Sequence, residues 1–174
     1  AGEVQKNLLP LEVFAKGRVT AGGICLYCDE TGGDYYDILH LDDNEKKIGV
    51  VVGDVVGHGI GAALLMTTVR ALLRCRISQP GDLGRIMDDV NRLLCQDTIK
   101  HGNFVTLFYL QVDCDNESIA WVRCGHEPAI VYFPVTDRFS ELSGPGMSLG
   151  VIPEGGYQRN EIPLAADPHL ILIC

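Results

Sequence analysis

The segment VVVGDVVGHGIGAALLM, residues 50–66, constrains the fold of this chain more than any other. It begins with three consecutive valines, which predict a buried strand that is apolar on both faces. It ends in Ala, Leu and Met residues, which favour a helix. The glycines between them permit a turn with positive φ or a close backbone approach. The segment therefore predicts a strand, a tight turn and a helix, with Asp54 at the end of the strand.

The position of Asp54 suits a metal ion or a phosphate group. A carboxylate oxygen, free backbone N–H groups and the helix dipole converge just before a helix N-terminus. Gly and Asp are also ordinary turn residues, and an Asp can simply cap the helix that follows it. The local sequence leaves both the ligand and the capping role open.

A second carboxylate is expected near Asp54. The turn residues Gly32 and Gly33 precede Asp34, where another strand opens. The polar residues 42–47 predict a hairpin loop that leads into the strand ending at Asp54. This hairpin would bring Asp34 and Asp54 towards one end of a sheet. Asp37 is three residues after Asp34 and would face the opposite side of the strand.

The order of elements indicates an α+β layered fold with largely antiparallel sheets, because strands precede and follow two consecutive helices without βαβ alternation. Helical spacing of apolar residues predicts helices over 59–77 and 82–96, the second capped by Asp82, and residues 1–9 read as the end of a helix stopped by Pro10. Further strands are expected over residues 18–27, 104–113, 119–124, 129–133, 157–163 and 169–174. The basic residues Arg70, Arg74 and Arg76 fall on the first long helix, where a solvated face and a contact with a phosphoprotein are both open.

Composition excludes several classes of function. With 23 acidic and 14 basic residues, the net charge is −9, which gives no general affinity for nucleic acid or anionic membrane. No apolar run approaches the roughly 20 residues that span a bilayer, and residues 1–10 do not form a signal peptide. Seven scattered cysteines favour the reducing cytoplasm. The pair Cys25 and Cys28 lacks the second Cys or His pair that a zinc site needs.

Five motifs occur in the order seen in one bacterial family. They are GGDYYD (residues 32–37), GDVVGHGIGAALLM (53–66), FVTLFY (104–109), CGHEPA (124–129) and GMSLGV (146–151). The chain resembles the metal-dependent, PPM-type protein serine/threonine phosphatases of the SpoIIE/RsbU branch. The resemblance implies an α-β-β-α sandwich of two antiparallel sheets flanked by helices. It assigns residues 1–10 to the end of a linker helix and residues 11–174 to the phosphatase domain.

This resemblance implies an activity and partners. Members of the family hydrolyse phosphoserine or phosphothreonine in proteins, usually in a small anti-sigma-factor antagonist. The phosphatase domain is typically the output end of a cytoplasmic signalling protein that carries an upstream sensor or receiver domain. Pairing of two chains through the N-terminal helix would give a homodimer. Independently of the resemblance, the acidic net charge argues against nucleic-acid binding, and the lack of a long apolar run argues against membrane insertion by this chain.

The resemblance also implies a site with two Mn²⁺ or Mg²⁺ ions. Asp34 would bind one ion, Asp54 would bridge both, and the backbone carbonyl of Val55 would be a further ligand. Asp37 is open between a carboxylate that supports the ligands and a solvated strand residue. His58 is a candidate general acid, although the family often has Lys there. The chemistry needs no side-chain nucleophile, because metal ions supply positive charge and activate water.

The resemblance also concerns the end of the chain and the motif CGHEP. The family has an Asp in a Thr-Asp-Gly turn directly after the strand that matches LILIC, whereas this chain ends at Cys174. We therefore expect a truncated domain that lacks a ligand for the second ion and has weak or no activity. His126 in CGHEP is expected to be a turn residue that hydrogen-bonds the backbone, with a catalytic role as the weaker alternative.

Two alternatives to the phosphatase are considered. The first is a phosphatase-like binding module without turnover. The second is a nucleotide-binding domain that uses GDVVGHGIG as its phosphate loop. That loop lacks the Gly-Lys-Ser/Thr ending of a P-loop and the GxGxxG of a dinucleotide fold, so the second alternative is the weaker one.

Overall fold

The computed structural model describes residues 2–10, 12–27 and 30–174. Its helical elements are α1 (Gly2–Lys6), α2 (Gly59–Ile77), α3 (Leu83–Thr98) and the short 3-10 helix η1 (Ile99–His101). Its strands are β1 (Phe14–Lys16), β2 (Val19–Ala21), β3 (Tyr35–His40), β4 (Lys47–Val55), β5 (Val105–Asp113), β6 (Ser118–Cys124), β7 (Ala129–Phe133), β8 (Arg138–Leu142), β9 (Asn160–Pro163) and β10 (Leu170–Leu172). None of the helices in these ranges is both long and apolar enough to cross a membrane.

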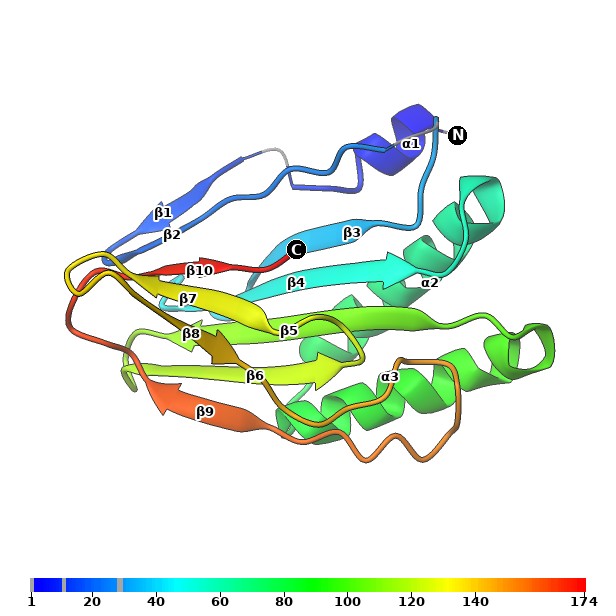
Figure 1. Ribbon diagram of the computed structural model, residues 1–174. Coiled ribbons are helices and arrows are strands. Elements are labelled where there is room, and N and C mark those ends of the chain that lie inside the picture. The colour runs from blue at the N-terminus through cyan, green and yellow to red at the C-terminus, as the bar shows by residue number, and fades with distance from the viewer. Residues whose placement is uncertain (1, 11, 28–29) are drawn as a thin grey trace.

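The strands form two main antiparallel sheets and a small hairpin. The central sheet has the order β3-β4-β5-β6-β9, the second sheet has the order β10-β7-β8, and β1 pairs with β2. Helices α2 and α3 lie on one face of the central sheet, and the other strands lie on its opposite face (Figure 1). The predicted α+β class and antiparallel sandwich are confirmed, and the described residues contain the α-β-β part of the predicted α-β-β-α order.

Two hydrophobic cores hold these layers together. The first lies between the helices and the central sheet and includes Met66 and Leu73 of α2 with Val51 of β4. The second lies between the sheets and includes Trp121 and Val131. Because successive side chains of a strand point to opposite faces, β4 contributes its odd-numbered residues to the first core and its even-numbered ones to the side facing the second sheet. Asp54 belongs to that second side.

The long elements of the sequence prediction are confirmed. Helix α2 has the predicted bounds. Asp82 caps α3, and its side chain accepts a hydrogen bond from the backbone N–H of Gly84 at 2.9 Å. The predicted hairpin is present, and β3 pairs with β4 along its whole length. Ala1, in the predicted N-terminal helix, lies outside the described residues, and α1 already ends at Lys6.

The predicted strand over residues 18–27 is wrong for most of its length. Only β2 (Val19–Ala21) is a strand, and residues 22–27 are not. A Cβ at Gly23 would lie 2.6 Å from ring atoms of Tyr36. The backbone at Gly23 therefore packs on an aromatic ring, and the apparent strand pattern of the sequence does not extend the ladder. Strands β1 and β8 were not predicted.

Candidate active site

Asp34 and Asp54 lie side by side at one end of the hairpin formed by β3 and β4. Tyr35 pairs with Gly53 in the antiparallel register, so one further step places Asp34 opposite Asp54. The pKa of Asp54 is raised above its ordinary value, first by partial burial and then by the negative charge of Asp34 and a hydrogen bond between the two carboxyl groups. The structure thus brings together the two carboxylates that the sequence pattern placed at one sheet end.

Glycine permits the close approach of the two strands at this point. A Cβ at Gly33 would lie 2.6 Å from the backbone carbonyl oxygen of Val55. That carbonyl, the third predicted ligand, therefore lies against the residue that precedes Asp34. The hydroxyl of Tyr27 donates a hydrogen bond to the backbone carbonyl of Asp34 at 3.2 Å and helps to fix the segment.

The donor set fits a hard divalent cation. Carboxylate and carbonyl oxygens are the ligands that Mg²⁺ and Mn²⁺ prefer. Two adjacent carboxylates disfavour each other's charged form, and a bound cation offsets this repulsion. Over residues 2–10, 12–27 and 30–174, however, no group of three or more His, Cys, Asp or Glu residues is placed to hold a metal ion. The described part of the site thus supplies two carboxylates.

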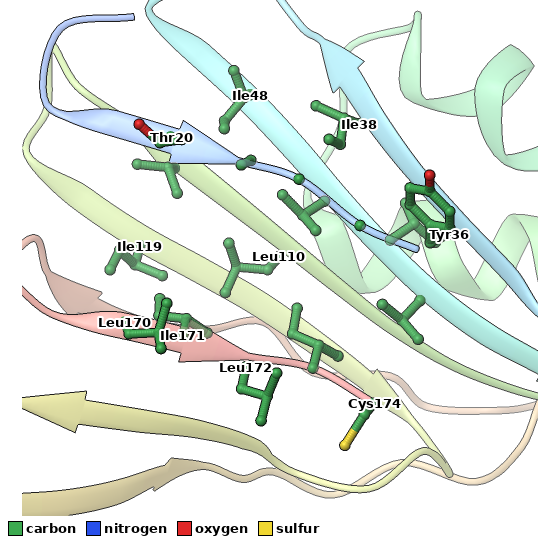
Figure 2. A pocket seen from close by; sticks show the side chains of 18 of the residues that line it. Thr20, Tyr36, Ile38, Ile48, Leu110, Ile119, Leu170, Ile171, Leu172 and Cys174 are labelled. Atoms are coloured by element: carbon green, nitrogen blue, oxygen red, sulfur yellow. The ribbon is translucent and has the colours of Figure 1, made fainter. Parts of the chain in front are cut away.

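The two carboxylates line a large groove between the sheets. Its volume is about 1240 Å³, and its walls come from the central sheet, from β2 and from β10. Figure 2 shows that Ile48 and Leu110 of the central sheet and Leu172 of β10 border this groove. Its lining also includes Thr106, His126 and Cys174. The groove is therefore mostly apolar, with a group of polar side chains that includes both predicted metal ligands.

His58 is placed differently from the carboxylates. It is the N-cap residue of α2 in extended conformation, with φ −145° and ψ 173°, and its side chain does not cap the helix. Gly57 and Gly59 on either side have φ of 93° and 74° and make the sharp turn from β4 into α2. His58 is exposed at this turn and is not part of the groove lining.

Asp37 forms a buried ion pair on the opposite face of β3. Its two carboxylate oxygens accept hydrogen bonds from Nε and Nη2 of Arg74, both at 2.7 Å, and the hydroxyl of Tyr35 donates to it at 2.7 Å. The side chain of Asp37 is 0% exposed, and Nε of Arg70 lies 3.8 Å from it. Asp37 is therefore not a solvated strand residue. Its partners are Tyr35 and two arginines of α2, and it does not support the predicted metal ligands.

The arginines of α2 are likewise engaged within the chain. Arg70 and Arg74 face Asp37, and Nε of Arg76 donates to Asp89 of α3 at 2.8 Å. These ion pairs replace the freely solvated face considered for the arginines, and the contact with a phosphoprotein stays a prediction. They join α2 to the central sheet and to α3.

The cysteine pair is only partly described. Cys28 lies outside the described residues, so the absence of a zinc site at this pair stays a prediction. Sγ of Cys25 lies 4.0 Å from the backbone carbonyl of Asp34, and burial raises the pKa of its thiol. A raised pKa makes a thiol less reactive.

Thr106 and His126 were not among the predicted site residues. Thr106 lies directly opposite Asp54 in the register of β4 and β5. Its Oγ1 is 2.9 Å from Nδ1 of His126, so the histidine ring is bonded to a side chain and not only to the backbone as expected. The motif CGHEPA draws attention to His126, whereas Thr106 follows only from the strand register.

Comparison with known proteins decides the family. The profile described as "Stage II sporulation protein E (SpoIIE)" matches residues 44–174. The chain belongs to the SpoIIE family. The resemblance read from the five motifs is thereby confirmed, and the matched range includes Asp54, Val55, His58 and His126.

Curated relatives of this SpoIIE-family chain are longer proteins. It is 26% identical to "Phosphoserine phosphatase RsbU" of Bacillus subtilis over 172 residues, which cover 99% of the chain and 50% of RsbU. It is 29% identical to "Phosphoserine phosphatase RsbP" of the same organism over 176 residues, covering 99% of the chain and 42% of RsbP. The chain thus spans about half the length of the curated relatives it matches.

Solved structures agree on the fold. The PP2C domain of SiaA from Pseudomonas aeruginosa has a TM-score of 0.72 at 20% identity, with 94% of this chain and 64% of that chain covered. RsbX in complex with magnesium has a TM-score of 0.58 at 18% identity, with 76% and 60% covered. These similarities confirm a PP2C-type, that is PPM-type, phosphatase fold.

Proposed function

We propose that this chain is the metal-dependent protein serine/threonine phosphatase domain of a bacterial signalling protein. The observation that carries the proposal is the juxtaposition of Asp34 and Asp54 at the sheet end of a SpoIIE-family fold. RsbU and RsbP, which are named phosphoserine phosphatases, align with essentially the whole chain. We assign residues 1–10 to the end of a linker helix and residues 11–174 to the phosphatase domain.

Asp34, Asp54 and the carbonyl of Val55 would hold the cation. Mn²⁺ or Mg²⁺, two ions in the complete domain, would offset the charge of a phosphomonoester dianion and lower the pKa of a bound water molecule. The residues of the chain orient this site, since the hairpin fixes the spacing of the two carboxylates and Gly33 brings the carbonyl of Val55 beside them. The magnesium complex of RsbX, which shares the fold, supports the choice of ion.

No cysteine of the described core fits the alternative role of nucleophile. Cys124 is fully buried, and burial raises the pKa of its thiol well above the ordinary value. The thiolate, which is the reactive form, is therefore disfavoured. Cys124 is therefore not a candidate nucleophile.

The proposed substrate is a phosphorylated protein, most simply an anti-sigma-factor antagonist, and the proposed upstream partner is a sensor or receiver domain. We place the protein in the cytoplasm. The cysteines that the structure describes, Cys25, Cys75, Cys95, Cys114, Cys124 and Cys174, form no disulfide, which is usual in a reducing compartment.

A phosphatase-like binding module is the second candidate. It is favoured by one observation, namely that the described residues offer two carboxylates and no third His, Cys, Asp or Glu for a metal ion. The two candidates differ in turnover, because both would bind the phosphoprotein.

The test measures the metal-dependent activity of this chain and of two single-residue variants. Mn²⁺-dependent phosphate release is measured on p-nitrophenyl phosphate and on a phosphoserine protein. Asp54→Asn removes the shared ligand, and Asp97→Asn at the exposed end of α3 is the matched control. Activity lost only in Asp54→Asn supports the phosphatase, whereas a folded, metal-saturated chain without turnover on either substrate supports the binding module.

A further inference from the structure

His126 is a buried polar residue that lines the same groove as Asp34 and Asp54. Its exposed fraction is 8%, and it lines the groove with Thr106 and Cys174. Nδ1 of the ring is 2.9 Å from Oγ1 of Thr106. Nε2 is inaccessible to solvent and has no hydrogen bond of good geometry, and the backbone of Cys174 is the polar group beside the ring. The imidazole therefore lies between the central sheet and the end of the C-terminal strand.

The turn that carries His126 is held rigidly. Nε of Arg123 donates a hydrogen bond to the backbone carbonyl of His126, and Nη1 of the same arginine donates to the carbonyl of Gly144 at 2.9 Å. Gly125 has φ +70°, and a Cβ there would lie 2.3 Å from Oγ of Ser148. The ring therefore has a fixed place from which to hold Thr106.

Thr106 connects this histidine to the candidate metal ligand. It lies directly opposite Asp54 in the ladder of β4 and β5. Directly opposite residues of an antiparallel pair have Cβ atoms only about 5 Å apart on the same face of the sheet. A displacement of Thr106 would therefore act directly on the position of Asp54.

A purely structural role explains His126 less well. A buried polar atom without a good hydrogen bond is costly, and an apolar side chain of the same shape would avoid that cost. Burial lowers the pKa of His126, so the ring is neutral and has one donor and one acceptor nitrogen. A neutral ring whose Nδ1 is hydrogen-bonded to Oγ1 of Thr106 can fix the position of the Thr106 side chain.

We propose that His126 is a positioning residue of the site, which acts through Thr106 to hold Asp54 in the place required for binding the cation. This inference rests on the metal site proposed above. Residues that support metal ligands from outside the coordination sphere commonly contribute tenfold or more to metal affinity. His126 belongs to that class, but it reaches the ligand Asp54 indirectly, through Thr106 on the neighbouring strand.

The test uses Mn²⁺ alone as the probe. Free Mn²⁺ is measured by electron paramagnetic resonance during titration, and the melting temperature is measured without metal. Thr106→Val removes the hydroxyl, and His126→Gln moves the polar atom to the position of Nε2. His126→Asn keeps a polar atom near the position of Nδ1 and can still bond Thr106. Thr98→Val is the matched control, because Thr98 is a buried threonine that bonds the carbonyls of Leu94 and Gly150.

We expect Thr106→Val and His126→Gln to weaken Mn²⁺ binding roughly tenfold, and His126→Asn and Thr98→Val to leave it within about twofold. Thr106→Val and Thr98→Val should lower the melting temperature comparably. Equal Mn²⁺ affinity in all four variants would overturn the inference and leave His126 a structural residue. A wild-type chain that binds no Mn²⁺ would overturn the proposed metal site itself, and this inference with it.

Discussion

Asp34 and Asp54 face each other across the first hairpin of the central sheet, and partial burial together with the charge of Asp34 raises the pKa of Asp54. This arrangement is unfavourable for an empty site, because two carboxylates share one small region. It becomes favourable when a divalent cation lies between them. The pair should therefore destabilise the folded chain without metal and stabilise it when a divalent cation is bound.

Asp54→Asn should stabilise the metal-free chain at neutral pH. The folded-state pKa of Asp54 is raised, so its contribution to stability is present below the unfolded pKa and is lost as the pH rises through the folded pKa. Asparagine carries no charge at any pH, so the variant does not lose this stability as the pH rises. The melting temperature of the variant should exceed that of the wild type at pH 7 without metal, and the two should converge near pH 3. Added Mn²⁺ should stabilise only the wild type, and a variant less stable than wild type at pH 7 would contradict the prediction.

Gly33→Ala should displace the segment that carries Asp34. A Cβ at this position would lie 2.6 Å from the carbonyl oxygen of Val55. Such overpacking typically costs about 1–3 kcal/mol, and Mn²⁺ affinity should fall with it. Gly61→Ala is the matched control, because a Cβ there meets nothing within 4 Å and Ala is favoured in a helix by about 0.5–1 kcal/mol. Urea unfolding measures both variants, and equal stability of the two would refute the argument.

Asp37→Asn should destabilise the fold without acting on metal binding directly. It leaves the guanidinium groups of Arg70 and Arg74 facing a neutral amide under α2. Breaking a buried pair from one side typically costs about 3–5 kcal/mol, and the lower end is expected because Arg74 is 43% exposed. The double variant Asp37→Leu, Arg74→Met should be less destabilised than the sum of its single changes. A strictly additive cycle in urea unfolding would show that the two residues do not interact.

His126 should make the fold sensitive to mild acid. Burial lowers its pKa in the folded state, so its contribution to stability is complete above the unfolded pKa of about 6.5 and is lost as the pH falls through the lower folded pKa. The difference in melting temperature between wild type and His126→Gln should therefore change between pH 7.5 and pH 4.5, with the wild type losing more. Parallel curves over that range would mean that His126 does not titrate differently in the two states.

The carboxylate pair could be predicted from the sequence because each step was local. Turn residues preceded Asp34, a valine-rich strand delivered Asp54, and one short polar loop joined the two strands. The register of a tight hairpin is then set by the loop and the alternation of side chains. Helices α2 and α3 were predictable for the same reason, since their apolar periodicity is continuous.

Other features depend on partners far away in the chain. The role of Asp37 stayed open in the sequence because its partner Arg74 is 37 positions away on α2. Thr106 meets His126 only through the ladder of β4 and β5 and the turn after β6. Strand β8 has four exposed residues out of five and shows little apolar alternation. These relationships arise from packing between elements, which no short sequence pattern contains.

The central claim is that Asp34 and Asp54 together hold a divalent cation. The most direct measurement is the anomalous scattering of crystals of this chain soaked in Mn²⁺. The account predicts a manganese peak about 2.1 Å from carboxylate oxygens of both Asp34 and Asp54, and no such peak in Asp54→Asn crystals. A peak elsewhere in the groove, or the same peak in the variant, would contradict it.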